Sequence, residues 1–313
     1  MLPVNRRDFL VGAAALALAP EALARELGGT PTALVTADLE SHVVAVELST
    51  GRVLREIPTR AGPRSIEQVG NLALVAHTEH GALSVIDGAT LRVRRVIGGF
   101  NEPRYTAAAD GRHAFVTDSG DGTVALVDVV AAKVLRRIEL GGPARHLSYD
   151  ASRRRLWVAL GTKALRVAVV DASQQRVLSR FAPPFLAHDV GLAVGGRSWV
   201  TSGEARELVV YRRGRPLRLR ADAPPQHVTF LDGRVFVTSG DDGTLRIYDA
   251  AGRLLRATRI PTGSYNVQHA FGGLILMPSL SRGTLCVADA SGRVLRTVRV
   301  ARSSHDACFV MSR

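Results

Sequence analysis

The chain has 313 residues, of which 46% are hydrophobic and 22% are charged. This composition excludes an intrinsically disordered protein and supplies enough apolar side chains for a large core. The formal net charge is +13, and arginine carries almost all of the positive charge, because Lys133 and Lys163 are the only lysines.

The first 24 residues are predicted to be an export signal peptide. They combine a basic start, an apolar run over residues 9–19, and small residues at Ala22 and Ala24. Residues 5–10, Asn-Arg-Arg-Asp-Phe-Leu, resemble the twin-arginine export motif. A Sec-type signal and an uncleaved N-terminal anchor are the alternatives. We therefore expect residues 25–313 to form one domain in the periplasm, exported by the twin-arginine route.

A unit of about 40 residues recurs seven times along the rest of the chain. The best copies are short apolar strands that end in aspartate, such as Leu-Ser-Val-Ile-Asp ending at Asp87. The other clear copies end at Asp128, Asp171, Asp249 and Asp289, and two weaker copies lie around Glu47 and Arg212. Because a fixed period of this size is typical of stacked supersecondary units, the repeat predicts the fold before any other signal.

One unit read in detail predicts four antiparallel strands. In the sixth unit, strands are expected over 234–239, 244–249 and 254–260, joined by glycine-containing turns, and an inner strand over 226–231 precedes them. Seven such units predict an all-β, seven-bladed β-propeller. The first unit has three strands, at 33–35, 43–47 and 53–57, whereas residues 305–311 form a lone strand at the C-terminus. We expect that last strand to complete the first blade and close the ring.

The repeat also supports a family resemblance. Residues 110–128, which contain Phe-Val-Thr-Asp-Ser-Gly-Asp-Gly before the strand ending at Asp128, resemble the YVTN-type propeller repeat. The resemblance covers about residues 32–311 and implies the propeller fold. It implies little about activity, because this family resembles quinoprotein-like and cytochrome d1-type propellers whose activities differ widely.

The repeat register places seven residues at one equivalent position, at the start of each inner strand, where side chains face the channel of a propeller. They are Ser65, Tyr105, His146, His188, His227, Asn266 and His305. Imidazoles that converge on an axis are what a Cu or Zn site needs, so His146, His188, His227 and His305 are the candidate metal ligands. A haem-type cofactor is a further candidate.

The residues next to this position add to the predicted site. Arg64, Arg104 and Arg145 each precede a ring residue and could hold an anionic ligand or cofactor at the channel mouth. Asp189 and Asp306 each follow a candidate ligand, and a carboxylate there could orient an imidazole.

Three functional interpretations remain open from the sequence. The first is a module that binds a small-molecule or protein partner at the mouth, the second a metal- or cofactor-dependent redox protein, and the third a structural scaffold with a filled channel. The histidines could also be purely structural, bonded to the backbone of a neighbouring blade. The common hydrolase and nucleotide motifs are absent from the sequence, so whether the protein is an enzyme stays undecided.

Other features limit the partners. Many arginines lie on predicted outermost strands, such as Arg136 and Arg256, where charge prevents pairing with the edges of other chains. This role explains most of the positive charge, and the periplasm offers no DNA or RNA, so we expect no nucleic-acid partner. We expect at most weak contact with a membrane surface, and we expect a monomer. No apolar run after the leader approaches the ~20 residues that a spanning helix needs, so no transmembrane segment is expected in the mature chain. Cys286 and Cys308 lie in apolar strands, where they are expected to be unbridged.

Overall fold

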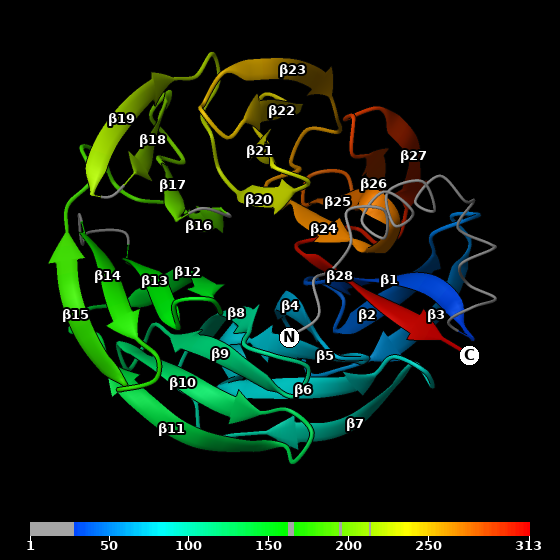
Figure 1. The fold of residues 1–313 in the computed structure, drawn as a ribbon. Helices are drawn as coiled ribbons and strands as arrows, with labels where there is room; N and C mark the ends of the chain where they lie inside the picture. The colour runs from blue at the N-terminus through cyan, green and yellow to red at the C-terminus, as the bar shows by residue number, and fades with distance from the viewer. Residues whose placement is uncertain (1–27, 162–165, 194–195, 213) are drawn as a thin grey trace, which may run out of the picture.

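The computed structural model describes residues 28–161, 166–193, 196–212 and 214–313. The predicted signal peptide, residues 1–24, lies outside the described residues. The described chain is a ring of seven four-stranded antiparallel sheets, confirming the predicted seven-bladed β-propeller (Figure 1). Among the described residues, no helix is long and apolar enough to cross a membrane.

Each blade contains one inner, two middle and one outer strand, and the blades follow one another around the ring. Blade 1 contains β28 (Ala307–Ser312), β1 (Thr30–Ala37), β2 (His42–Glu47) and β3 (Val53–Pro58). Blade 2 contains β4 (Pro63–Val69), β5 (Leu72–His77), β6 (Ala82–Asp87) and β7 (Arg92–Ile97). Blade 3 contains β8 (Pro103–Ala108), β9 (His113–Asp118), β10 (Thr123–Asp128) and β11 (Lys133–Glu139). Blade 4 contains β12 (Ala144–Asp150), β13 (Arg155–Leu160), β14 (Arg166–Asp171) and β15 (Arg176–Phe181).

The remaining blades repeat this order. Blade 5 contains β16 (Val190–Ala193), β17 (Arg197–Thr201), β18 (Glu207–Arg212) and β19 (Arg215–Arg220). Blade 6 contains β20 (Val228–Leu231), β21 (Arg234–Ser239), β22 (Thr244–Asp249) and β23 (Leu254–Arg259). Blade 7 contains β24 (Gln268–Ala270), β25 (Leu274–Ser279), β26 (Thr284–Asp289) and β27 (Val294–Arg299). Among the residues that the structure describes, two single 3-10 turns, η2 (Thr78–His80) and η3 (Phe271–Gly273), lie in connections.

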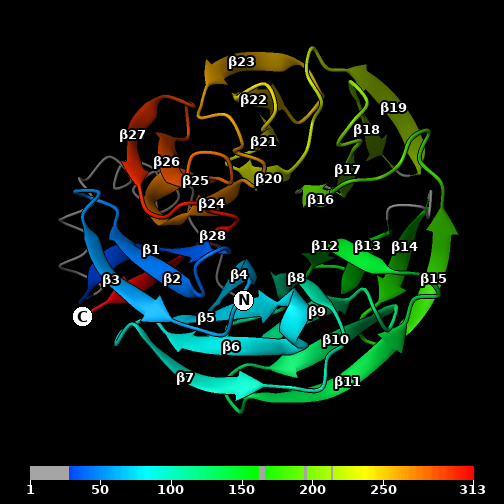
Figure 2. The ribbon, with the colours of Figure 1, turned by 180° about the vertical axis from the view of Figure 1, so that it is seen from behind.

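The ring is closed by the C-terminal strand, as predicted. Strand β28 pairs antiparallel with β1, from Thr30 opposite Ser312 to Val35 opposite Ala307. Figure 2 shows the last strand of the chain, red β28, beside the first described strand, blue β1. The closure leaves neither blade 1 nor blade 7 with an open face.

The core lies between neighbouring blades. One apolar cluster, for example, joins Leu74 and Val85 of blade 2 to Val116 and Ala125 of blade 3, all fully buried. A blade cannot bury both of its faces alone, which is the physical reason for the repeat. The outer strands are exposed and carry arginines such as Arg136. Both cysteines are buried and unbridged.

Two expected inner strands begin later than predicted. The regular pairing of β20 begins at Val228 instead of residue 226, and that of β28 runs from Ala307 to Ser312 instead of 305–311. The backbone at His227 and His305 is irregular, although it still bonds the adjacent strand, as in the 3.1 Å bond from the His305 amide to the Thr36 carbonyl. This irregularity determines where the ring residues point.

Candidate functional site

A β-bulge lies at the start of three inner strands. In blade 2, Pro63 pairs with His77 and Ile66 with Val75, so Arg64 and Ser65 together face one residue of β5. Strands β8 and β12 have the same irregularity at Arg104–Tyr105 and Arg145–His146. A bulge bends the strand and redirects its side chains. The bulge thus explains how two consecutive residues of one strand can both contribute to the channel.

Threonine hydroxyls on the adjacent strands stabilise this irregular backbone. Thr117 Oγ1 accepts the Tyr105 amide at 3.0 Å and donates to its carbonyl at 3.2 Å. Thr36 Oγ1 accepts the Asp306 amide at 2.9 Å and donates to the Arg64 carbonyl of the next blade at 3.0 Å. Sequence reasoning missed these residues. The recurring Val-Thr pair before a turn was the available signal, and it is present again at Thr201 and Thr238.

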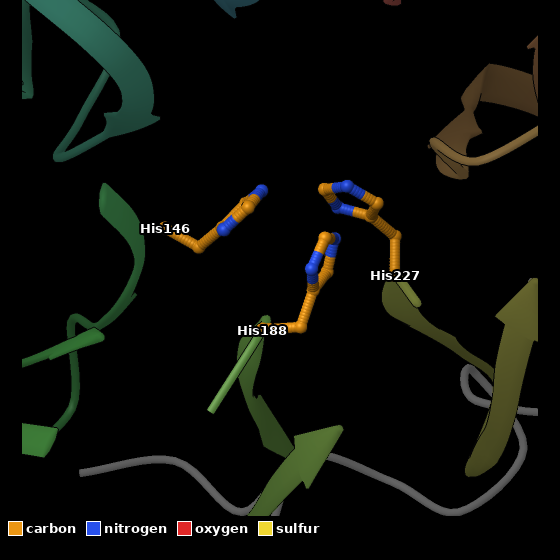
Figure 3. Close-up of side chains that lie close together, drawn as sticks. All are labelled: His146, His188 and His227. Atoms are coloured by element: carbon orange, nitrogen blue, oxygen red, sulfur yellow. The ribbon is translucent and has the colours of Figure 1, made fainter. Parts of the chain in front are cut away.

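The ring residues form one packed layer across the channel. The ring centroids of His146 and His188 are 4.9 Å apart, those of His146 and His227 4.5 Å, and those of His188 and His227 5.1 Å. Figure 3 shows these three imidazoles pointing toward one another from three neighbouring blades. Tyr105 packs on His146 at a centroid distance of 3.6 Å. Ser65 is also buried in the layer.

The structure separates the fourth candidate ligand from this group. The ligand atoms of His146, His188 and His227 all lie within 4.8 Å of one another, whereas His305 does not belong to the group. Instead, the Asn266 amide nitrogen lies 3.2 Å from His305 Nδ1 and donates to the His305 carbonyl at 2.6 Å. Asn266 occupies the ring position between His227 and His305. Asn266 therefore engages His305, which the sequence had grouped with the other three histidines.

Burial keeps the imidazoles of His146 and His188 neutral. Desolvation is the main cause that lowers the pKa of His146 well below its usual value, with a smaller contribution from His227. The pKa of His188 falls to about 3, mainly through desolvation and then through His227. At neutral pH both rings therefore carry a free lone pair on one nitrogen. Such lone pairs are what a metal ion or a hydrogen-bond donor needs.

The carboxylates beside the histidines serve the next blade. Asp189 Oδ2 accepts the Val228 amide at 3.0 Å and lies 3.4 Å from His227 Nδ1. Asp306 repeats the backbone contact, with its Oδ2 accepting the Ile66 amide at 3.1 Å. Asp189 therefore contacts the histidine of blade 6, His227.

Three arginines converge at one end of the channel. Arg64, Arg104 and Arg145 are half-buried, and the Nε atom of each is buried without a hydrogen-bond partner. Among the described residues, none of the three forms an ion pair with a carboxylate. Burial is the main cause that lowers the pKa of Arg104, and the charges of Arg145 and Arg64 lower it further. We call this end the arginine mouth.

A cavity of about 540 Å³ lies on the other side of the ring layer. Every blade repeats the same strand order, so the inner strands all run in one direction and residue position gives depth along the channel. The lining begins at the ring layer and continues inward, past Glu67 and Gln68 in blade 2. Burial raises the pKa of Glu67 to about 8, with a further contribution from Asp306, and burial raises the pKa of Asp306 to about 7. The two sides of the layer therefore differ, one cationic and one weakly acidic.

The channel thus contains all ten predicted site residues at neighbouring depths, and it divides the predicted metal ligands into a group of three and His305. The roles of these residues in binding a ligand or a metal remain predictions. The guanidinium groups can bind an anion at the arginine mouth. In the adjacent ring layer, the imidazole nitrogens can accept a hydrogen bond or bind a metal ion.

Comparisons with known proteins support the fold. No protein-family model matches the chain. No curated protein matches it either. Among solved structures, the chain is similar to Kuenenia stuttgartiensis hydrazine synthase, with a TM-score of 0.73 and 15% identity over 83% of this chain and 93% of that one. It is also similar to the dihydro-heme d1 dehydrogenase NirN in complex with DHE, with a TM-score of 0.64 and 14% identity over 87% of this chain and 73% of that one. At such low identities the similarity concerns the fold alone.

Proposed function

We propose that this chain is an exported, YVTN-type β-propeller that binds a small anionic ligand at the arginine mouth of its channel. The observation that carries the proposal is the group formed by Arg64, Arg104 and Arg145, whose buried Nε atoms have no partner. Buried donors are normally satisfied, so an unpaired set points to a partner from outside the chain. Export rests on the sequence of residues 1–24, which resembles a twin-arginine signal.

The chemistry of arginine suggests the ligand class. Guanidinium groups bind carboxylate and phosphate through two parallel hydrogen bonds, and these bonds are stronger than those between neutral groups. Three of them on adjacent blades fit a ligand with several anionic oxygens. The solved structure of NirN is described as a complex with DHE. A tetrapyrrole that carries carboxylates is therefore one member of the class, beside small carboxylic acids and phosphate.

The other two interpretations have less support. A scaffold requires a channel filled along its length, whereas a cavity of about 540 Å³ occupies part of this one. A redox protein requires a bound metal or cofactor, and the histidines must be tested for that separately.

Calorimetric titration of the purified protein at low ionic strength tests the proposal, with citrate, phosphate and metal-free protoporphyrin as probes. We expect at least one probe to bind with one molecule per chain and more weakly as salt rises. Arg104→Gln should weaken that binding by roughly 10- to 100-fold, because it removes a charge-assisted hydrogen bond worth about 1.5–3 kcal/mol.

The matched control is Arg136→Gln, which removes an exposed arginine from outer strand β11. It should leave binding unchanged. Failure of all three probes to bind, or an equal loss in both variants, would refute the proposal.

A further inference from the structure

His146 is a buried imidazole with no hydrogen-bond partner. It is only 2% exposed, and neither Nδ1 nor Nε2 has a partner. Leaving a buried polar group unsatisfied destabilises the folded state. His188 and His227 each present a ring nitrogen within 4.8 Å of a ring nitrogen of His146. Two neutral imidazoles can satisfy each other only where one donates, and no such bond is formed with His146.

The surroundings of the other two histidines restrict their orientation. A Cβ added at Gly203 would lie 2.7 Å from His188 Nδ1, so the loop after β17 packs closely on this ring. Gly203 also has a φ of +76°, a conformation that disfavours any larger residue. In blade 6, the Asp189 carboxylate beside Nδ1 of His227 favours the tautomer that carries its proton there. That tautomer leaves the lone pair on Nε2.

We propose that His146, His188 and His227 together bind one transition-metal ion of the Zn²⁺ or Cu²⁺ class. Three imidazoles from three neighbouring blades form the donor set, with ligand atoms within 4.8 Å of one another. Zinc–nitrogen bonds of about 2.0–2.1 Å place tetrahedral ligand atoms about 3.3 Å apart, so small side-chain rotations are enough to close the site. Asp189 is a positioning residue, because it contacts His227 and not the metal.

The position of the group suggests what completes the coordination. Three protein ligands leave one position of a tetrahedral ion open. Arg145 belongs to the arginine mouth and directly precedes His146 in the same bulge. We infer that the anion bound at the arginine mouth supplies the fourth ligand; this second step rests on the function proposed above.

Metal binding by the demetallated full-length mature protein, with no added carboxylate or phosphate, tests the site itself. We expect one equivalent of Zn²⁺ or Cu²⁺ per chain. The Cu²⁺ electron paramagnetic resonance spectrum of the wild-type protein should show hyperfine coupling to about three imidazole nitrogens. This spectrum needs no variant, so it remains informative even if a substitution prevents folding.

Variants then identify the ligands. His188→Gln and His227→Gln should each abolish stoichiometric binding, and Asp189→Asn should weaken it by about 10- to 100-fold. His80→Ala, in exposed η2, is the matched control and should bind normally. His305→Ala should also retain the ion. Absence of stoichiometric metal in the wild type, or equal loss in His80→Ala or His305→Ala, would overturn the assignment.

A further pair of measurements distinguishes this inference from the proposed function. Arg104→Gln should bind the metal normally while binding the anion roughly 10- to 100-fold more weakly. If His188→Gln binds the anion without metal, the result supports anion binding at the arginine mouth. The metal site is then judged by the Cu²⁺ spectrum of the wild-type protein. If adding the anion leaves the Cu²⁺ spectrum of the wild type unchanged, the anion is not the fourth ligand.

Discussion

The strand that closes the ring provides a quantitative test of the fold. Phe309 lies in β28, opposite Ala33 of β1, and is 6% exposed. It belongs to a cluster with Leu276 and Leu285, so it joins the closing strand to blade 7 as well as to blade 1. Phe309→Ala therefore removes apolar contacts on both sides of the junction.

The expected loss is large relative to the stability of a domain. Truncation of a buried phenylalanine costs about 3–5 kcal/mol, because a cavity remains where the ring was. The free energy of unfolding of a typical domain is only about 5–15 kcal/mol. We therefore expect Phe309→Ala to lower the free energy of unfolding by about 4 kcal/mol in urea titrations followed by tryptophan fluorescence.

Phe271 provides the matched control. Its ring stacks on Phe309 at a centroid distance of 5.7 Å, but it is 41% exposed. Phe271→Ala removes the same stacking contact but much less buried surface, so we expect the free energy of unfolding to fall by only about 1 kcal/mol. In Phe309→Ala, amide hydrogen exchange should accelerate most in β1 and β28. A loss below about 1 kcal/mol, or acceleration spread equally over all blades, would show that Phe309 does not hold the closing strand in the ring.

Two further predictions concern buried ionisable groups. Burial raises the pKa of Glu67 from 4.5 to about 8, so the folded state binds a proton that the unfolded state has released, and Glu67 reduces stability as pH rises through this range. Glu67→Gln should therefore stabilise the protein at pH 9 more than at pH 5, by about 1–2 kcal/mol. The full pKa shift corresponds to roughly 5 kcal/mol, and we expect less because the side chain borders the cavity and is partly screened by solvent. The measurement is urea unfolding at both pH values with exposed Glu56→Gln as the control, and equal effects at the two pH values would contradict it. Burial also raises the pKa of the thiols of Cys286 and Cys308, so a thiol reagent should label neither in the native protein and both in urea; rapid labelling of the native protein would show that these strands open.

The architecture follows from the amino-acid sequence alone. The 40-residue period predicted seven blades, and the surplus strand at the C-terminus predicted the closure, because each blade must bury both faces against its neighbours. The same period predicted that residues from Ser65 to His305 lie at one depth of the channel. The repeat therefore places the candidate site at one depth of the channel, since equivalent repeat positions are equivalent in space.

The packing of the blades determines which of these residues lie together. Equal spacing in the sequence treats His305 like the other three histidines, but Asn266 lies between it and His227 and engages it by a hydrogen bond. The sequence also places Asp189 beside His188, whereas the blade geometry brings it to His227. The physical reason is that a repeat defines the depth of a residue, while the bulged backbone and the side chains of the adjacent blade define its direction.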